Sequence, residues 1–189
     1  MNRLAPDTKI PGLGGETIGD FWAWAYSDLL INTTRGVFAE FLVGSALAVV
    51  SGIRGAWDAF DLLYEGSRIE VKSSAYVQRW PQERPSTISW GIEERFAYNV
   101  ATDTWGDEQV RSADCYVFCL YTEKDREMAN VLDLGKWKFY VLSTKRINRE
   151  LGAQKRVGLG TIKSMTEPED YGRLKERVDR ELSGIDSTR

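Results

Sequence analysis

The sequence contains no histidine at all, and this absence restricts its chemistry more than any other feature of its composition. Mechanisms that need an imidazole are excluded, among them serine and cysteine triads and hydrolysis at a histidine-bound zinc ion. Only two cysteines occur, Cys115 and Cys119, in the run DCYVFCLY. Four residues apart on a strand, they would face the same way but lie too far apart to bond, so we expect two reduced thiols in the core. Catalysis would have to use carboxylates, lysine, hydroxyl groups or a cofactor.

Nucleotide-binding loops and long apolar runs are also missing. No GxxxxGK[ST] loop occurs, and the GLGG at 12–15 lacks the preceding strand that a dinucleotide-binding fingerprint requires. The N-terminal residues MNRLAPDTKIPGLGG lack the apolar stretch of a signal peptide. The longest apolar run, FLVGSALAVVSGI, is much shorter than a membrane span. These features predict a cytoplasmic protein that does not enter a membrane.

The chain has no excess of positive charge. Its 189 residues carry a formal net charge of -3, with 42% hydrophobic and 28% charged residues, which is the composition of an ordinary globular domain. Nucleic acid is held mainly by lysine and arginine, so this charge counts against a passive nucleic-acid binder. It counts less against an enzyme, because a metal site gathers carboxylates while a local basic rim can hold the substrate.

Periodicity predicts helices toward both ends of the chain and strands between them. Residues 1–15 are rich in proline and glycine and read as an extended arm, followed by a single domain over 16–189. The expected helices and strands are as follows. Helical spacing occurs at 16–30, 32–50, 145–151 and 167–184, and β-prone runs occur at 56–64, 67–76, 86–92, 113–121 and 137–143. This order predicts an α/β (α+β) fold with a mixed central sheet flanked by helices.

Charged side chains gather on one face of the predicted hairpin FDLLYEGSRIEVKSS. With the turn centred on its Glu-Gly pair, facing positions sum to 131, which places Asp61 opposite Glu70. Because alternate residues of a strand share a face, Lys72 lies on the same face as Glu70. A loop that differs by one residue would place Asp58 there in place of Asp61, and the spacing alone leaves both open.

A further carboxylate, Glu40, is embedded in the apolar helical run VFAEFLV and needs a partner or a metal ion. Two converging carboxylates, Asp61 and Glu70, suit Mg²⁺, which prefers oxygen ligands, and Mn²⁺ is expected to substitute for it. Such a metal lowers the pKa of its water and neutralises a phosphate, while the ammonium of Lys72 orients the nucleophile or stabilises developing charge. These residue types favour phosphodiester hydrolysis without histidine.

The hairpin, with the glutamate-bearing helix upstream, resembles the PD-(D/E)XK nucleases, the restriction-endonuclease-like superfamily. The resemblance covers roughly residues 33–142 and implies an αβββαβ core around a mixed sheet. It implies that Asp61 is the first acid of the motif, that Glu70 and Lys72 are its (D/E)XK residues, and that Glu40 is the acid of the preceding helix. These acids would bind Mg²⁺.

The resemblance implies further contacts around the site. The peptide carbonyl of Val71 is expected to bind the metal, and Gln78 stands where some relatives place a glutamine near the site. Phe60 replaces the proline of the motif, which is a common departure. Beside these, Arg79 in the run YVQRW and Arg35 on the second helix are candidates for holding substrate phosphates.

The sequence therefore predicts a small Mg²⁺-dependent nuclease with nucleic acid, DNA in particular, as its partner, acting as a homodimer or within a larger defence or repair assembly. A [DE]xK tripeptide arises by chance roughly once in a chain of this composition, so two alternatives stay open. One is a restriction-endonuclease-like subunit that binds nucleic acid or serves assembly without catalysis. The other is an unrelated mixed domain whose hairpin is a solvated surface.

Overall fold

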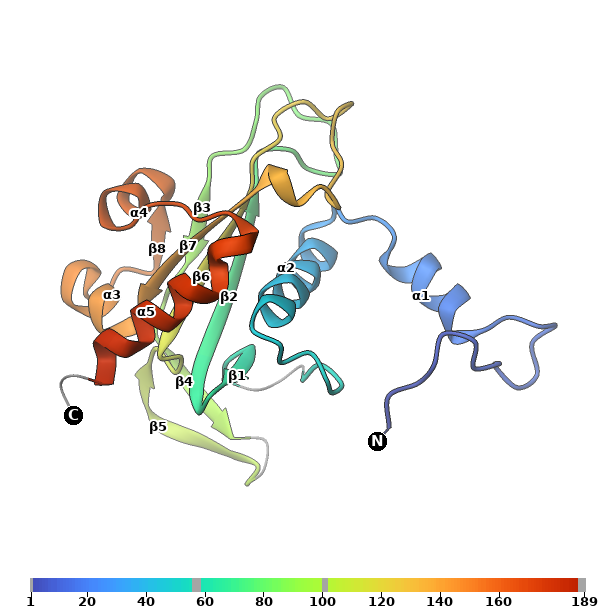
Figure 1. The fold of residues 1–189 in the computed structure, drawn as a ribbon, viewed down its shortest axis with the longest axis horizontal. Helices are drawn as coiled ribbons and strands as arrows, with labels where there is room; N and C mark the ends of the chain where they lie inside the picture. Colours follow the sequence, from blue (N-terminus) through green and yellow to red (C-terminus); the bar gives the residue numbers. More distant parts are fainter. Residues whose placement is uncertain (1, 56–58, 100–101, 187–189) are drawn as a thin grey trace.

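A mixed sheet lies at the centre of the computed structural model, which describes residues 2–55, 59–99 and 102–186 (Figure 1). The helices are α1 (Ile18–Tyr26), α2 (Asn32–Ala46), α3 (Thr144–Leu151), α4 (Leu159–Met165) and α5 (Leu174–Asp186), with short 3₁₀ helices at Leu134–Lys136 and Tyr171–Arg173. The strands are β1 (Leu62–Tyr64), β2 (Ser67–Ala75), β3 (Ser89–Gly91), β4 (Arg95–Asn99), β5 (Thr104–Val110), β6 (Cys115–Tyr121), β7 (Trp137–Ser143) and β8 (Arg156–Gly158).

The central sheet has the order β1-β2-β6-β7. Strand β2 pairs parallel with β6, whereas β1 pairs antiparallel with β2 and β7 antiparallel with β6. The predicted mixed central sheet flanked by helices is therefore confirmed. The connection between the parallel strands, residues 76–114, carries β3 and the β4–β5 hairpin, and no helix occurs in its described residues. Outside the central sheet, β3 pairs with β8 and β4 with β5.

Strand β6 is buried on both faces along its whole length. The side chains of Cys115, Val117 and Cys119 pack in one core with α2 and α5, and Phe118 packs in a second core with β3, β8, α3 and α4. A strand that is covered on both sides needs the near-continuous apolar run found here. Cys115 and Cys119 are free and buried, as predicted.

The tight turn between β1 and β2 sets the register of the hairpin. Glu65 and Gly66 both have positive φ, 48° and 81°, which is the turn conformation that matches the twist of two-residue hairpins and which glycine adopts without strain. The register pairs Leu62 with Ile69, so the predicted sum of 131 is confirmed. Of the predicted strand 56–64, residues 56–58 lie outside the described residues and β1 begins only at Leu62, but the Asp61 N–H donates to the Ile69 carbonyl at 3.1 Å and extends the pairing.

Several short elements were not predicted from the sequence, namely β4, β5, β8 and α4. Strand β8 has only three residues and α4 only seven, too few to show a period. Strand β5, TWGDEQV, is exposed at every position and therefore lacks the apolar alternation of a half-buried strand. The predicted strand at 86–92 does form as β3, but it pairs with β8 outside the central sheet.

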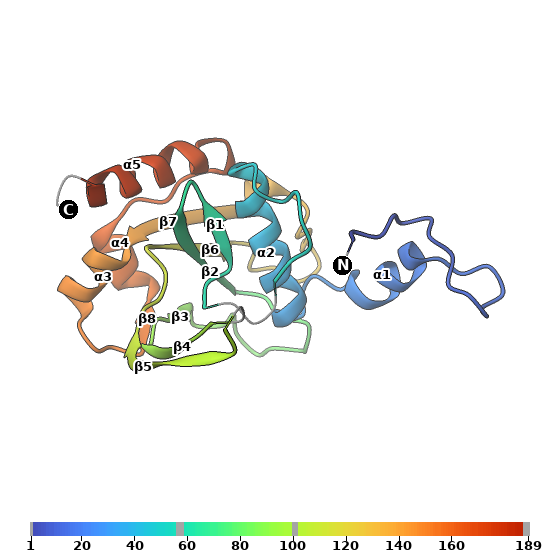
Figure 2. The ribbon, with the colours of Figure 1, turned by 90° about the horizontal axis from the view of Figure 1, so that it is seen from below.

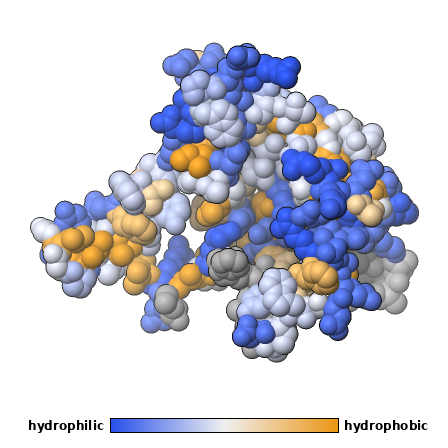
Figure 3. All heavy atoms as spheres, turned by 180° about the vertical axis from the view of Figure 1, so that it is seen from behind, coloured by the Kyte–Doolittle hydropathy of each residue, from blue (hydrophilic) through white to orange (hydrophobic). Residues whose placement is uncertain are grey.

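Helix α1 and the arm before it stand apart from the body (Figures 1 and 2). A reciprocal capping box starts the helix, because the Asp20 N–H donates to Thr17 Oγ1 at 3.2 Å and the Thr17 N–H donates to Asp20 Oδ2 at 2.8 Å. No residue of α1 is buried, and Trp24 is 85% exposed. Figure 3 shows apolar side chains gathered on this projection. In the described residues no helix is both long and apolar enough to cross a membrane.

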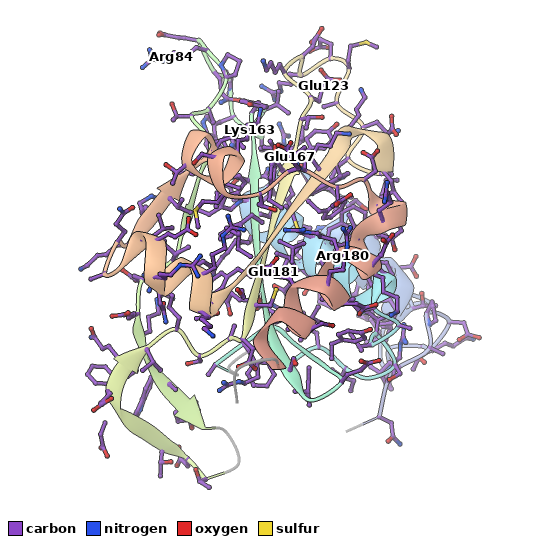
Figure 4. The ribbon with its side chains drawn as sticks, turned by 60° about the vertical axis from the view of Figure 1, so that its left-hand side comes forward. Arg84, Glu123, Lys163, Glu167, Arg180 and Glu181 are labelled. Carbon is purple, nitrogen blue, oxygen red and sulfur yellow. The ribbon has the colours of Figure 1, made fainter. Side chains whose placement is uncertain are left out.

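Helix α5 covers the first core and is tied to the end of β7. Glu181 Oε1 accepts a hydrogen bond from the Ser143 N–H at 2.9 Å, and its other oxygen accepts one from Arg177 at 3.1 Å. Figure 4 shows Arg180 and Glu181 next to each other on this helix. The contact fixes the point where β7 ends and α3 begins.

Candidate functional site

The two charged residues of the (D/E)XK motif lie in the middle of β2. Because Ile69 and Val71 point into the core under α2 and α5, Glu70 and Lys72 point to the opposite face of the sheet. There Lys72 Nζ forms an ion pair with Glu70. The Glu70 side chain is 18% exposed and the Lys72 side chain 32% exposed, so both reach the surface from within the sheet. The strand therefore presents an acid and a base together at an open face.

Asp61, one residue before β1, is held against the same strand. Its Oδ2 accepts a hydrogen bond from the Val71 N–H at 2.7 Å. The pKa of Asp61 is raised to about 7, mainly by burial and also by the negative charges of Glu70 and Glu40, whereas the Val71 hydrogen bond and the Lys72 charge oppose the shift. Two carboxylates thus share a poorly solvated place, and a proton or a cation at Asp61 relieves their repulsion.

This raised pKa predicts that the metal-free protein loses stability as the pH rises. Asp61 titrates near pH 7 in the folded chain, and an aspartate titrates near pH 4 when unfolded. The stabilising proton is therefore fully present below about pH 4 and is lost as the pH rises through about 7. Three pKa units correspond to at most about 4 kcal/mol. Thermal unfolding of wild type and Asp61→Asn in metal-free buffer over this range measures the difference, and two parallel curves would contradict the prediction.

Glu40 lies on α2 with its side chain 13% exposed, and the partner that its embedded carboxylate required is Arg54. The guanidinium meets the carboxylate at two points, Arg54 Nε with Oε2 and Arg54 Nη2 with Oε1, the latter at 2.8 Å. The hydrogen bonds to Glu40 raise the pKa of the Arg54 guanidinium, and the charge of Asp61 adds to this effect. Glu40 and Arg54 therefore form a fixed pair at the edge of the acidic site.

A cavity of about 860 Å³ opens in front of Asp61, Glu70 and Lys72. Its other walls come from the connection between β2 and β6 and from β6 itself, and include Arg95, Phe96, Tyr98, Trp105, Arg111 and Tyr116. The sequence analysis missed all of these. The alternation of RFAY in β4 was an available signal for a strand, but nothing in it indicates which other residues the strand faces.

Arg111 is a structural member of this cavity wall. Its side chain is fully enclosed, although it carries a permanent charge. The guanidinium donates to the Ile92 carbonyl at 2.6 Å, to Asn148 Oδ1 at 2.6 Å, to the carbonyls of Gly152 and Gln154 at 2.8 and 3.0 Å, and to Glu94 at 3.3 Å. It therefore joins the segment before β4 to the end of α3 and the loop before β8.

The three residues expected to hold substrate do not line the cavity, since Gln78 and Arg79 follow β2 and Arg35 lies near the start of α2. Arg35 is only 2% exposed, burial lowers its pKa to about 10, and its Nη2 lies 3.5 Å from Gln78 Oε1. Gln78 also donates to the Ala75 carbonyl at 3.0 Å. Arg79 pairs with Asp28. The structure thus groups Arg35 and Gln78 with each other and not with the acids.

The sequence left both Asp58 and Asp61 open as the acid opposite Glu70. Asp58 lies outside the described residues, and the structure places Asp61 beside Glu70. In the part of the chain that the structure describes, no three acidic or cysteine side chains group closely enough to form a metal centre on their own. The pair beside β2 is Asp61 with Glu70, and Val71 lies between Glu70 and Lys72 with its N–H on Asp61. A cation here would rely on two carboxylates and on non-carboxylate oxygens.

The family model of bacteriophage T4 endonuclease IV matches residues 24–156, well over half of the chain. The chain belongs to the bacteriophage T4 endonuclease IV family. The matched range contains every residue of the acidic site and both strands of the β4–β5 hairpin. Membership of an endonuclease family supports a nuclease that acts on DNA. No curated protein matches the chain.

Proposed function

We propose that this nuclease cuts DNA at a Mg²⁺-dependent PD-(D/E)XK site formed by Asp61, Glu70, Lys72 and Glu40. The observation that carries the proposal is the hydrogen bond from the Val71 N–H to Asp61 Oδ2, because it fixes the carboxylate just before β1 beside the Glu70–Lys72 pair of β2. The side chains of Asp61, Glu70 and Lys72 face one cavity. Family membership supports the nuclease activity, and this arrangement supports the residues that perform it.

The oxygen donors present suit a divalent metal ion. Burial and the charge of Glu70 raise the pKa of Asp61 to about 7, so its carboxylate is ionised at neutral pH only at a cost that a cation offsets. Mg²⁺ is commonly held by one or two carboxylates plus waters and substrate phosphates, so Asp61, Glu70 and the Val71 carbonyl suffice. Mn²⁺ accepts the same oxygen ligands. When bound, the ion supplies an activated water and neutralises phosphate charge.

The remaining chemistry belongs to the side chains of the chain itself. The ammonium of Lys72, held by Glu70 and partly exposed, donates to the attacking water or to a phosphate oxygen on which charge develops. Asp61 is kept in place by the Val71 N–H. Arg54 holds Glu40 at the edge of the site and, being 44% exposed, offers its guanidinium to an incoming phosphate.

DNA cleavage with Mg²⁺, Mn²⁺ or EDTA by wild type and Lys72→Ala tests the proposal. We expect metal-dependent cutting by the wild type and an approximately 100-fold slower reaction for Lys72→Ala, the size of effect that loss of one positioned donor has elsewhere. Lys163→Ala, which alters an exposed lysine on α4 (Figure 4), is the matched control and should cut like wild type. No cutting of single- or double-stranded DNA, together with no Mn²⁺-induced rise in melting temperature, would overturn the proposal and favour a non-catalytic subunit.

A further inference from the structure

The β4–β5 hairpin projects from the body as a two-stranded sheet of its own and forms one side of the cavity (Figure 4). Every residue of β5 is exposed. An isolated pair of strands is only marginally stable in water, so large apolar side chains on such a hairpin are not accounted for by a core of its own. Their position at the cavity gives them another use.

Three aromatic side chains lie on this hairpin and face the cavity: Phe96, Tyr98 and Trp105. Trp105 is 67% exposed and Phe96 is 47% exposed. The rings of Tyr98 and Trp105 are in contact, with centroids 4.9 Å apart, and the Tyr98 hydroxyl donates to Asp103 at 2.5 Å. The indole is therefore held by a neighbour on one side while most of its surface faces solvent, the arrangement of an aromatic group that receives a ligand.

Phe96 and Trp105 also line a second hollow of about 420 Å³, which includes Lys155. Together with the Glu93–Arg95 ion pair, these two side chains line both hollows and form the ridge between the second hollow and the cavity that holds Asp61 and Glu70. Each hollow has the size of sites that accept small organic ligands. A nucleotide strand that crosses the ridge would bring one base onto the aromatic rings while its phosphate lies beside the acids.

The charges of the hairpin favour contact with a base over contact with a phosphate. Asp103, Asp107 and Glu108 are exposed acids on this hairpin. Arg95 is engaged by Glu93, at 2.9 Å. Negative charge repels a phosphate, whereas the face of a nucleobase is uncharged and stacks on indole or phenol rings.

We propose that Trp105, supported by Tyr98 and Phe96, is a stacking subsite for a DNA base that has left its own stack next to the phosphate to be cut. The proposal rests on the proposed function, because it places the base relative to Asp61, Glu70 and Lys72. Trp105 is a positioning residue in this scheme and takes no part in the bond-breaking step. Stacking of this kind tolerates any base sequence, since every base has a π-face.

The test measures, by fluorescence anisotropy, the Kd of a short fluorescein-labelled oligonucleotide, single-stranded or in a duplex. Ca²⁺ replaces Mg²⁺ so that binding is measured without cleavage. Trp105→Ala is expected to raise the Kd about 10-fold, and Trp105→Phe to stay within about 3-fold of wild type, because a phenyl ring still stacks. Trp24→Ala removes a tryptophan that is even more exposed but lies on α1, outside the cavity, and should bind like wild type. Melting temperatures of all variants show whether each one folds.

A second measurement separates stacking from a structural effect of the substitution. When the missing base is the one that would stack on Trp105, an oligonucleotide with one abasic position should bind wild type more weakly than the intact oligonucleotide does. Trp105→Ala should bind the abasic and the intact oligonucleotide equally well. Equal Kd values for Trp105→Ala and Trp24→Ala would overturn the inference. So would a Trp105→Ala variant that binds DNA like wild type but no longer self-associates, because Trp105 would then contact a second copy of the chain and not a base. If wild type fails to cut DNA but Trp105→Ala binds more weakly, the proposed catalysis fails and the subsite stands. If wild type cuts DNA but Trp105→Ala binds DNA like wild type, the stacking subsite is wrong and the proposed catalysis stands.

Discussion

Asp61→Asn is expected to slow DNA cleavage about 1,000-fold, roughly 4 kcal/mol of transition-state stabilisation, while the chain folds as before. Asparagine keeps an oxygen that accepts the Val71 hydrogen bond but carries no charge for a metal ion. Near pH 8 the melting temperature in metal-free buffer should rise, because the variant no longer has to ionise a group whose pKa is about 7. Single-turnover cleavage and thermal unfolding measure the two effects.

Asp7→Asn is the matched control, since Asp7 is an exposed aspartate of the N-terminal arm. It should change neither the cleavage rate nor the melting temperature. Asp61→Asn is thus expected to lower the cleavage rate and to raise the melting temperature, and a general loss of folding would not produce this combination. A variant that loses both activity and stability would show that Asp61 serves the fold through its charge, which contradicts the role given to it here.

Arg111→Lys is expected to destabilise the protein by about 3 kcal/mol or more, although both side chains are cations. The guanidinium of Arg111 satisfies acceptors from five residues in a closed environment. A lysine has three donors and cannot match a planar fork, so buried carbonyl groups lose their partners. The midpoint and slope of urea unfolding measure the loss.

The control for this substitution is Arg84→Lys, because Arg84 is exposed on the loop after β2 (Figure 4). It should alter stability by no more than about 0.5 kcal/mol. Arg111 lines the cavity, so a role in holding DNA is the competing interpretation. Unchanged stability with weakened oligonucleotide binding in Arg111→Lys would establish that interpretation.

The hairpin that carries Asp61, Glu70 and Lys72 could be predicted because its geometry is local. A Glu-Gly turn with two positive φ angles fixes the register, and strand alternation then decides which charges share a face. The burial of Cys115 and Cys119 was predictable for a similar reason, since a continuous apolar run suits only a strand that is covered on both sides.

The rest of the site depends on contacts between distant segments. Glu40 binds Arg54 from a loop, and Arg35 of α2 meets Gln78 beyond β2, so neither pair follows from a local period. Trp105 escaped prediction because its strand, β5, is exposed at every position and has no apolar alternation to mark it. Arg111 illustrates the same limit, since a single arginine in the sequence does not reveal five acceptors gathered from three segments.

The parallel pairing of β2 with β6 also determines when the proposed site can form during synthesis of the chain. A ribosome makes the hairpin with both acids and the lysine early, but the neighbour that completes the sheet around β2 follows only after residues 76–114. Pairing across so long a connection forms slowly and cannot start before the second strand has left the exit tunnel. The nascent chain therefore carries Asp61, Glu70 and Lys72 without the cavity around them, and the site proposed for catalysis is assembled only after β6 has been translated.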